Sequence, residues 1–225
     1  MPVNKEAYLS LKKELDEKKV KLVAVSKTKP GEDILELYHL GQKDFGENYV
    51  QELVNKASKL PEDIRWHYIG HLQTNKVKLI APFVQLIHGV DSLKLLKAIN
   101  KEAIKNNRII DCLLQMHIAQ EETKFGLNED ELKLLLNQYD KLEMDNVRLC
   151  GLMGMASFTE NIASVMKEFQ NIKRVFDTYA GINRSFIHME ILSTGMSGDY
   201  KAAIEAGSTM VRIGSLLFGE RTHSV

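Results

Sequence analysis

Cysteines are scarce in this 225-residue sequence, and long hydrophobic runs are missing. The two cysteines, Cys112 and Cys150, lie far apart in apolar surroundings, so we expect reduced, structural thiols rather than a disulfide. No apolar run approaches the roughly 18 residues that a membrane span needs. The N-terminus has no hydrophobic signal core either. We therefore expect a cytoplasmic protein that does not associate with membranes.

Net charge is also absent, because 30 Lys and Arg balance 30 Asp and Glu. Without a long-range field to attract phosphate polymers, a dedicated nucleic-acid-binding protein is disfavoured. The motifs of zinc hydrolases, P-loop proteins and serine hydrolases are missing as well. His67 and His71 are four residues apart but span a strand end and a turn, so we expect no metal site. The composition is 44% hydrophobic and 27% charged, which is ordinary for a globular protein.

Short apolar segments alternate with longer amphipathic segments along nearly the whole chain. The predicted strands are Leu22–Ser26, Asp44–Asn48, Arg65–Ile69, Leu86–Val90, Cys112–Ile118, Arg148–Met153, Ile191–Gly195 and Met210–Gly214. The clearest predicted helices are Lys5–Lys18, Asp91–Asn107, Glu129–Leu142 and Ala163–Tyr179. Asp91 or Ser92 supplies the N-cap of the second of these helices. Such alternation implies a parallel sheet with right-handed crossovers.

Eight predicted strands suit a closed parallel barrel, with about 28 residues for each strand–helix unit. The rival fold is an open doubly wound sheet, which usually carries a glycine-rich fingerprint after its first strand. Here that turn reads SKTKPGED, which is no such fingerprint. No linker or low-complexity segment marks a domain boundary. The predicted fold is therefore α/β, a single (β/α)8 TIM barrel over residues 1–225, with an extra N-terminal helix.

In such a barrel the chemistry lies at the C-terminal ends of the strands. Lys27 directly follows the first predicted strand. A lysine buried at a barrel mouth can act as a neutral amine that attacks aldehydes and ketones to form a Schiff base. A lysine in this position can equally mark the solvated end of a strand. Local sequence alone does not decide between these two interpretations.

The last two predicted strands are each followed by small and hydroxyl-bearing residues. Ser193, Thr194 and Gly195 lie at the end of the seventh predicted strand, and Gly214 and Ser215 lie at the end of the eighth, after its MVRI run. Hydroxyls and exposed backbone N–H groups at these two positions form the usual phosphate site of a barrel. Such residues can also be simple turn chemistry. A lysine on the first strand beside a phosphate site indicates a phosphorylated aldehyde, and pyridoxal 5′-phosphate is the obvious candidate.

Five stretches carry a family resemblance: VAVSKTKP, FGENYVQE, WHYIGHLQTNK, GLMGMAS and STGMSGDYKAAIEAGSTMVRIGSLLFG. They extend from Val23 to Gly219 and so cover nearly the whole chain. Together they are highly specific, although none is decisive singly. On these motifs the sequence resembles the YggS/PROSC family of pyridoxal phosphate homeostasis proteins, which share the barrel of alanine racemase.

The resemblance implies a set of cofactor-binding residues: Lys27, Asn48, His71, Ser193, Thr194, Arg212, Gly214 and Ser215. It makes Lys27 the Schiff-base lysine and places Arg212 at the pyridine nitrogen, which a permanent cation keeps unprotonated. The two serines, Thr194 and Gly214 would hold the phosphate. Asn48 and His71 would lie near the ring, with Met153 and Met155 packed around it. His71 can instead cap a helix, and the methionines can simply fill core gaps.

The resemblance also implies a binding protein rather than an enzyme. Related racemases use a tyrosine from an additional β domain and a dimer partner, and the chain's end at Val225 leads us to expect no such domain. Tyr49, Tyr68 and Tyr200 are the remaining candidates for a second acid–base group. We expect a monomer that carries or buffers pyridoxal phosphate in vitamin B6 and amino-acid homeostasis, with apo-enzymes as possible recipients. The alternatives are a weak amino-acid racemase or lyase, and a barrel that no longer binds the cofactor.

Overall fold

The computed structural model describes residues 3–119, 125–139, 141–142, 144–181, 183–184 and 186–219. Its strands are β1 (Lys21–Val25), β2 (Asp44–Glu47), β3 (Arg65–Tyr68), β4 (Leu86–Val90), β5 (Ile110–Met116), β6 (Val147–Gly154), β7 (Asn183–Arg184), β8 (Ile187–Ser193) and β9 (Met210–Ile213). Its helices are α1 (Lys5–Glu17), α2 (Gly31–His39), α3 (Val50–Ala57), the 3₁₀ turn η1 (Thr74–Lys76), α4 (Val77–Ile80), α5 (Leu93–Lys105), α6 (Glu129–Tyr139), α7 (Ile162–Tyr179), α8 (Tyr200–Glu205) and α9 (Ser215–Phe218).

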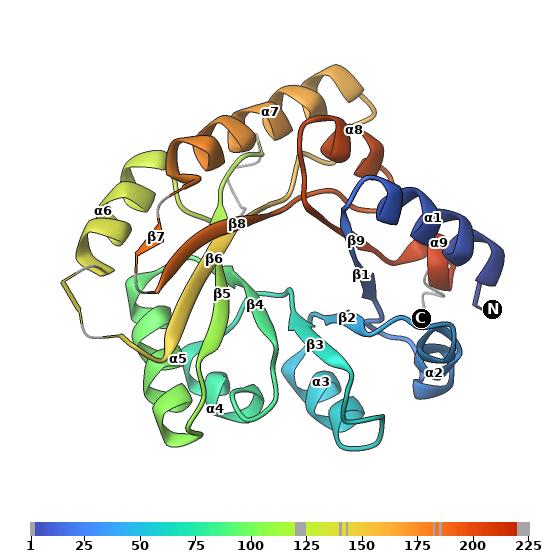
Figure 1. Cartoon of the computed structure of the whole chain (residues 1–225), viewed down its shortest axis with the longest axis horizontal. Helices are drawn as coiled ribbons and strands as arrows, with labels where there is room; N and C mark the ends of the chain where they lie inside the picture. The colour runs from blue at the N-terminus through green and yellow to red at the C-terminus, as the bar shows by residue number, and fades with distance from the viewer. Residues whose placement is uncertain are drawn as a thin grey trace.

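The strands close into a parallel barrel, as predicted. In the described part of the chain, β1 to β6 pair in order, β6 pairs with β8, and β9 joins β8 to β1. The helices surround the ring of strands (Figure 1). Each of the eight predicted strands is present. The two-residue β7, which pairs antiparallel with β8, was not predicted, because so short a segment has no apolar periodicity.

The near-continuous apolar character of the strands follows from burial on both faces. Leu22 and Ala24 belong to the large core between sheet and helices, whereas Val23 belongs to a separate smaller core. The smaller core, which we assign to the barrel interior, consists of Val23, Leu86, Leu113, Cys150, Met153 and Met210. Cys112 lies in the large core, and both cysteines are free and buried. The predicted structural thiols are thereby confirmed, and burial raises the pKa of Cys150 to about 12.

The N-terminus of α5 is capped by one of the two residues that the sequence predicts for this position. Of the two candidates for the α5 N-cap, the structure selects Ser92, whose Oγ accepts a hydrogen bond from the N–H of Leu95 at 3.3 Å.

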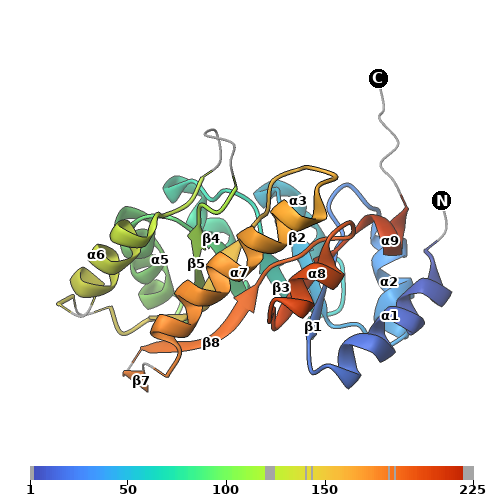
Figure 2. The same cartoon turned by 90° about the horizontal axis from the view of Figure 1, so that it is seen from above.

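The extra helix α1 lies beside α9 (Figure 2), and the N–H of Asn4 donates to the carbonyl of Leu217 at 2.8 Å. Across the described ranges, no helix has both the length and the apolarity to cross a bilayer.

Candidate cofactor-binding site

A cavity of about 550 Å³ opens at the C-terminal ends of the barrel strands. Pockets for small ligands commonly have volumes of roughly 300–1,000 Å³. The segments that follow β1, β2, β3, β6 and β8 line it, together with β9 and the start of α9. The lining residues are Val25, Lys27, Lys29, Asn48, Ile69, Met155, Ala156, Ser157, Phe158, Thr159, Ile162, Val165, Met196, Ser197, Gly198, Asp199, Arg212, Gly214, Ser215 and Gly219.

Lys27 stands on a tight turn directly after β1. The turn is closed by the N–H of Lys29, which donates to the carbonyl of Ser26 at 3.0 Å. Thr28 has a φ of +65°, which is unusual for a β-branched residue. Its N–H donates to Glu52 Oε1 at 2.6 Å, and this bond helps to hold the strained residue in place. The half-buried Lys27 side chain is thus fixed at its base and lines the cavity.

A buried ion-pair network contacts this turn through Ser26 and Thr28. Lys56 Nζ donates to Glu47 Oε1 at 2.7 Å, to Glu52 Oε1 at 2.6 Å and to the Ser26 carbonyl at 2.7 Å. Ser26 Oγ also donates to Glu47 Oε1, at 2.6 Å. Burial raises the pKa of Glu47, and the neighbouring Lys56 opposes that shift. The network therefore holds the two neighbours of Lys27: Lys56 binds the carbonyl of Ser26, and Glu52 accepts from the N–H of Thr28. This network was not predicted from the sequence.

Arg212 lies on β9 and is only 3% exposed. Its Nη1 donates to the carbonyl and Oγ of Ser193, at 2.7 and 2.8 Å, and its Nη2 donates to the Gly154 carbonyl at 3.0 Å. Burial lowers the pKa of Arg212 to about 10, against the opposing charge of Asp199. The guanidinium therefore remains a cation at neutral pH, and it is anchored to two other strands while it lines the cavity.

Asn48 follows β2 and also lines the cavity. Its Oδ1 is buried and accepts no hydrogen bond from the described part of the chain. A buried acceptor without a donor is costly. A bound group or a water molecule that supplies a donor would relieve this cost, so the amide fits a ligand in the cavity.

The turn after β8 brings a second set of groups to the cavity. Gly195 has a φ of +89°, and a Cβ on it would lie 2.6 Å from Ala203 Cβ, so the turn requires glycine. The N–H of Met196 donates to Asp199 Oδ1 at 2.5 Å. Ser197 Oγ accepts from the N–H of Gly214 at 3.2 Å, which joins this turn to the start of α9.

The structure brings together five of the eight predicted site residues: Lys27, Asn48, Arg212, Gly214 and Ser215. Met155 lines the cavity with them, whereas Met153 lies in the smaller core. Ser193, Thr194 and His71 are not among the lining residues.

Ser193 and Thr194 are fully or almost fully buried, with exposures of 0% and 1%. The reason is that β8 ends at Ser193 rather than at Gly195, so Met196, Ser197 and Gly198 reach the cavity instead. His71 lies to one side, where its ring stacks on Phe125 with the ring centroids 4.1 Å apart. Its Nδ1 is 3.7 Å from Asp91 Oδ2.

Sequence reasoning missed the cavity residues outside the strand ends. They come from the turn after β8 and from the loop after β6, where Ser157 and Thr159 line the cavity. The available signal was the resemblance-carrying stretches GLMGMAS and STGMSGDYK, which hold or adjoin these residues.

The three tyrosines considered as acid–base groups are not among the cavity-lining residues. Tyr68 is buried and donates to the carbonyl of His71 at 3.1 Å, and burial raises its pKa to about 12. Tyr200 donates to Glu14 Oε2 on α1, at 3.4 Å. Tyr49 is exposed.

Comparison with known proteins identifies the family. Residues 5–222 match the model of the alanine racemase N-terminal domain. A pyridoxal phosphate homeostasis protein of Aquifex aeolicus is 43% identical over 205 residues, which cover 90% of this chain and 88% of the relative. The chain belongs to the pyridoxal phosphate homeostasis proteins.

Solved structures agree with this family assignment. PipY of Synechococcus elongatus is 32% identical, and the match covers 95% of this chain and 99% of that one. Its TM-scores are 0.87 for the structure without PLP and 0.83 for the structure with PLP bound. The resemblance that the sequence motifs carried is therefore confirmed.

Proposed function

We propose that this homeostasis-family protein binds pyridoxal 5′-phosphate in the cavity and carries or buffers it within vitamin B6 and amino-acid homeostasis. One observation carries the proposal: Lys27, Asn48 and Arg212 line a single cavity at the C-terminal ends of the strands. When bound, the cofactor supplies an aldehyde carbon with which a lysine amine condenses reversibly. A reversible covalent link suits the storage and delivery of a reactive aldehyde.

The residues divide the binding work among them. Lys27 provides the amine on a turn whose flanking residues are held by the Glu47–Lys56 network. The Arg212 guanidinium can only donate hydrogen bonds, so it favours an unprotonated ring nitrogen as its partner. Ser197, Gly214 and Ser215 offer hydroxyls and first-turn N–H groups to the phosphate. In this proposal Ser197 takes the phosphate-binding role that the sequence analysis gave to Ser193 and Thr194.

We further propose that the protein is a carrier rather than an enzyme. In the described part of the chain, the ionisable side chains that line the cavity are Lys27, Lys29, Asp199 and Arg212. Lys29 Nζ donates to the Phe218 carbonyl at 2.7 Å, and Asp199 accepts from the backbone of its own turn. Racemisation needs a second acid–base group on the opposite face of the cofactor, and neither residue is poised for that task.

We propose that the protein delivers the cofactor to apo-enzymes that need it. We also propose that it acts in the cytoplasm as a single-domain monomer. The form of the cavity mouth supports transfer to a partner. Phe158 is 99% exposed, and Ile162 and Met196 are also exposed beside the cavity. Such apolar groups at an open mouth allow a partner to approach the cofactor closely.

Borohydride trapping tests the binding site. We expect reduction of the loaded protein to fix the cofactor on Lys27, and peptide mapping to find the label there. Lys27→Met should abolish labelling yet keep weaker, non-covalent binding through the phosphate site. Lys29→Met, a matched change two residues away, should still be labelled. Label found on Lys29 in the unaltered protein would overturn the proposed site.

Hydrogen–deuterium exchange at the α-carbon of amino acids tests the carrier assignment. Because Lys29 and Asp199 are both engaged in hydrogen bonds to the backbone, exchange and racemisation should stay near the rate of free pyridoxal phosphate. The measurement is NMR of a panel of amino acids incubated in D₂O with the loaded protein. Sustained turnover of any one amino acid would make the protein a racemase or lyase instead.

A further inference from the structure

A chain of polar side chains crosses the interior of the barrel. It links Asp44 on β2, His67 on β3, His88 on β4, Ser193 on β8 and Arg212 on β9. Asp44 Oδ1 lies 3.0 Å from His67 Nε2, and His67 Nδ1 lies 2.9 Å from His88 Nε2. His88 Nδ1 lies 3.2 Å from Ser193 Oγ, which accepts from Arg212 Nη1 at 2.8 Å. All five side chains are buried.

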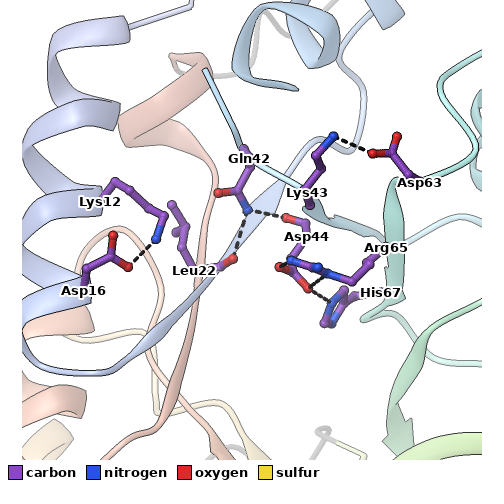
Figure 3. Close-up of polar contacts among 9 residues, drawn as sticks. All are labelled: Lys12, Asp16, Leu22, Gln42, Lys43, Asp44, Asp63, Arg65 and His67. Carbon is purple, nitrogen blue, oxygen red and sulfur yellow. Dashed lines mark hydrogen bonds and ion pairs between the residues drawn. The ribbon is translucent and has the colours of Figure 1, made fainter. Parts of the chain in front are cut away.

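The two ends of this chain belong to opposite ends of the barrel. Arg212 lines the cofactor cavity, whereas Asp44 is the first residue of β2 and lines a separate depression of about 350 Å³ at the N-terminal ends of the strands. There Arg65 grips Asp44 through two hydrogen bonds, from Nε at 3.0 Å and from Nη2 at 2.6 Å (Figure 3). Asp44 itself does not line the cofactor cavity.

Donor chemistry gives the chain a single direction. A guanidinium only donates, so Ser193 Oγ accepts from Arg212 and its own hydroxyl proton is available for His88 Nδ1. His88 then carries its proton on Nε2 and donates to His67 Nδ1. His67 likewise carries its proton on Nε2 and donates to Asp44, which as a carboxylate only accepts. Every hydrogen bond thus points from the cation towards the anion.

The electrostatics of the chain agree with this assignment. Burial lowers the pKa of both imidazoles, most strongly that of His88, so both rings are neutral at pH 7. Burial alone would raise the pKa of Asp44, but the hydrogen bonds from His67 and Arg65 outweigh it and lower that pKa well below its ordinary value. Neutral rings between a fixed cation and a fixed anion can satisfy every bond in one tautomeric arrangement.

We propose that Asp44, His67, His88 and Ser193 act as positioning residues for Arg212, and that their one-directional chain couples the N-terminal end of the barrel to the cofactor cavity. The proposal rests on the proposed function, because it concerns how Arg212 is presented to the cofactor. Asp44 fixes the tautomer of each imidazole in turn. His88 Nδ1 then fixes the orientation of the Ser193 hydroxyl, which accepts a hydrogen bond from the Arg212 guanidinium.

Nitrogen-15 NMR of the histidine rings in the cofactor-free protein tests the chain directly. At pH 7 we expect His67 and His88 each to show a protonated Nε2 and an unprotonated Nδ1. Asp44→Asn removes the fixed acceptor, so the signals of both rings should move towards a mixture of tautomers. Asp63→Asn is the matched control, because Asp63 also accepts from a cation near this end of the barrel, Lys43, but lies outside the chain (Figure 3).

Cofactor affinity supplies the second readout. Asp44→Asn and Ser193→Ala should each weaken pyridoxal phosphate binding about three- to tenfold, as expected for one hydrogen bond of a buried network. Ser208→Ala is the matched control for Ser193→Ala. Ser208 is a buried serine whose hydroxyl contacts the same strand ends, with a bond to the Leu192 carbonyl at 3.1 Å, but it lies outside the chain.

The outcomes separate the two proposals. A ring with its proton on Nδ1, a charged ring, or His88 signals that do not respond to Asp44→Asn would overturn the chain, whatever the cofactor does. Equal losses of affinity in Ser193→Ala and Ser208→Ala would reduce Ser193 to a packing role and would also overturn it. If the unaltered protein binds no pyridoxal phosphate, the proposed function fails, and the ring nitrogens still decide whether the chain exists. Should Asp44→Asn not fold, the nitrogen signals of the unaltered protein and Ser193→Ala remain decisive.

Discussion

At the scale of single residues, the protein buries several charged side chains. Removing ions from water is expensive, and a buried pair often contributes little net stability. Lys56 avoids an unsatisfied interior charge because its ammonium group has three oxygen acceptors, on Ser26, Glu47 and Glu52. Since the acceptors lie around the Lys27 turn, we interpret the network as a device that shapes the turn.

His67 and His88 predict how stability responds to acid. Their pKa values are lowered in the folded protein, whereas in the unfolded chain they return to about 6.5. Below that pH the unfolded state binds protons that the folded state does not, so the free energy of unfolding falls as the pH falls. Each histidine contributes a slope of up to ~1.4 kcal/mol per pH unit. Denaturant titrations at pH 7.5, 6 and 5 measure it.

The variant His88→Asn isolates one of these contributions. It should be less stable at pH 7.5, yet its stability should fall less steeply between pH 6.5 and 5 than that of the unaltered protein. His39→Gln, which removes an exposed histidine at the end of α2, is measured over the same pH range as a control for loss of a histidine from the surface. Parallel curves for His88→Asn and the unaltered protein would contradict the neutral, buried state of His88.

At the scale of elements, the strands could be predicted from the sequence more reliably than their ends. Doubly covered strands read as apolar runs, but His188 and Glu190 interrupt the apolar pattern of β8. The expected strand therefore began four residues late and ended two residues late. That offset put Ser193 and Thr194 at the cavity end of the expected strand, whereas in the structure Met196, Ser197 and Gly198 line the cavity. Short helices such as α4, α8 and α9 span too few residues to show a helical period.

A glycine in β6 predicts where the barrel tolerates no side chain. The pairing of β6 with both neighbouring strands shifts register next to Gly151, which has a φ of +152°. A Cβ at this position would lie 1.8 Å from the carbonyl oxygen of Ile191 on β8. Gly151→Ala must push the two strands apart, so we expect a loss of more than about 2 kcal/mol in the free energy of unfolding.

The control for this substitution is Gly31→Ala at the start of α2. A Cβ there would lie 3.4 Å from Leu60 Cδ2, an ordinary contact distance. Gly31→Ala should change the free energy of unfolding by no more than about 1 kcal/mol. The change can be an increase, because alanine favours the helix. Urea unfolding of both variants gives the comparison. Equal stabilities for Gly151→Ala and Gly31→Ala would show that β6 and β8 can separate at little cost.

At the scale of the whole molecule, three sequence features together predicted the barrel: the alternation of strands and helices, the eight predicted strands, and the lack of a glycine-rich fingerprint after the first strand. The predicted barrel also placed Lys27, Gly214 and Ser215 at one end, since the carboxyl ends of parallel strands share an end of the barrel, whereas Asn48 and Arg212 were predicted from the family resemblance. The polar chain could not be predicted in this way. His67 and His88 are 21 residues apart, and His88 and Ser193 are 105 residues apart. Only the closure of the barrel brings such distant residues within hydrogen-bonding distance.

The polar chain has a consequence for protein engineering. In parallel barrels the C-terminal ends of the strands are usually changed to alter binding, and the N-terminal ends are changed to improve stability, as if the two were independent. Asp44 and Arg65 belong to the stability end by position, yet they terminate a line of contacts that reaches the guanidinium in the cavity. A library that randomises charges around Asp44 to raise the melting temperature would therefore also alter the affinity for the cofactor.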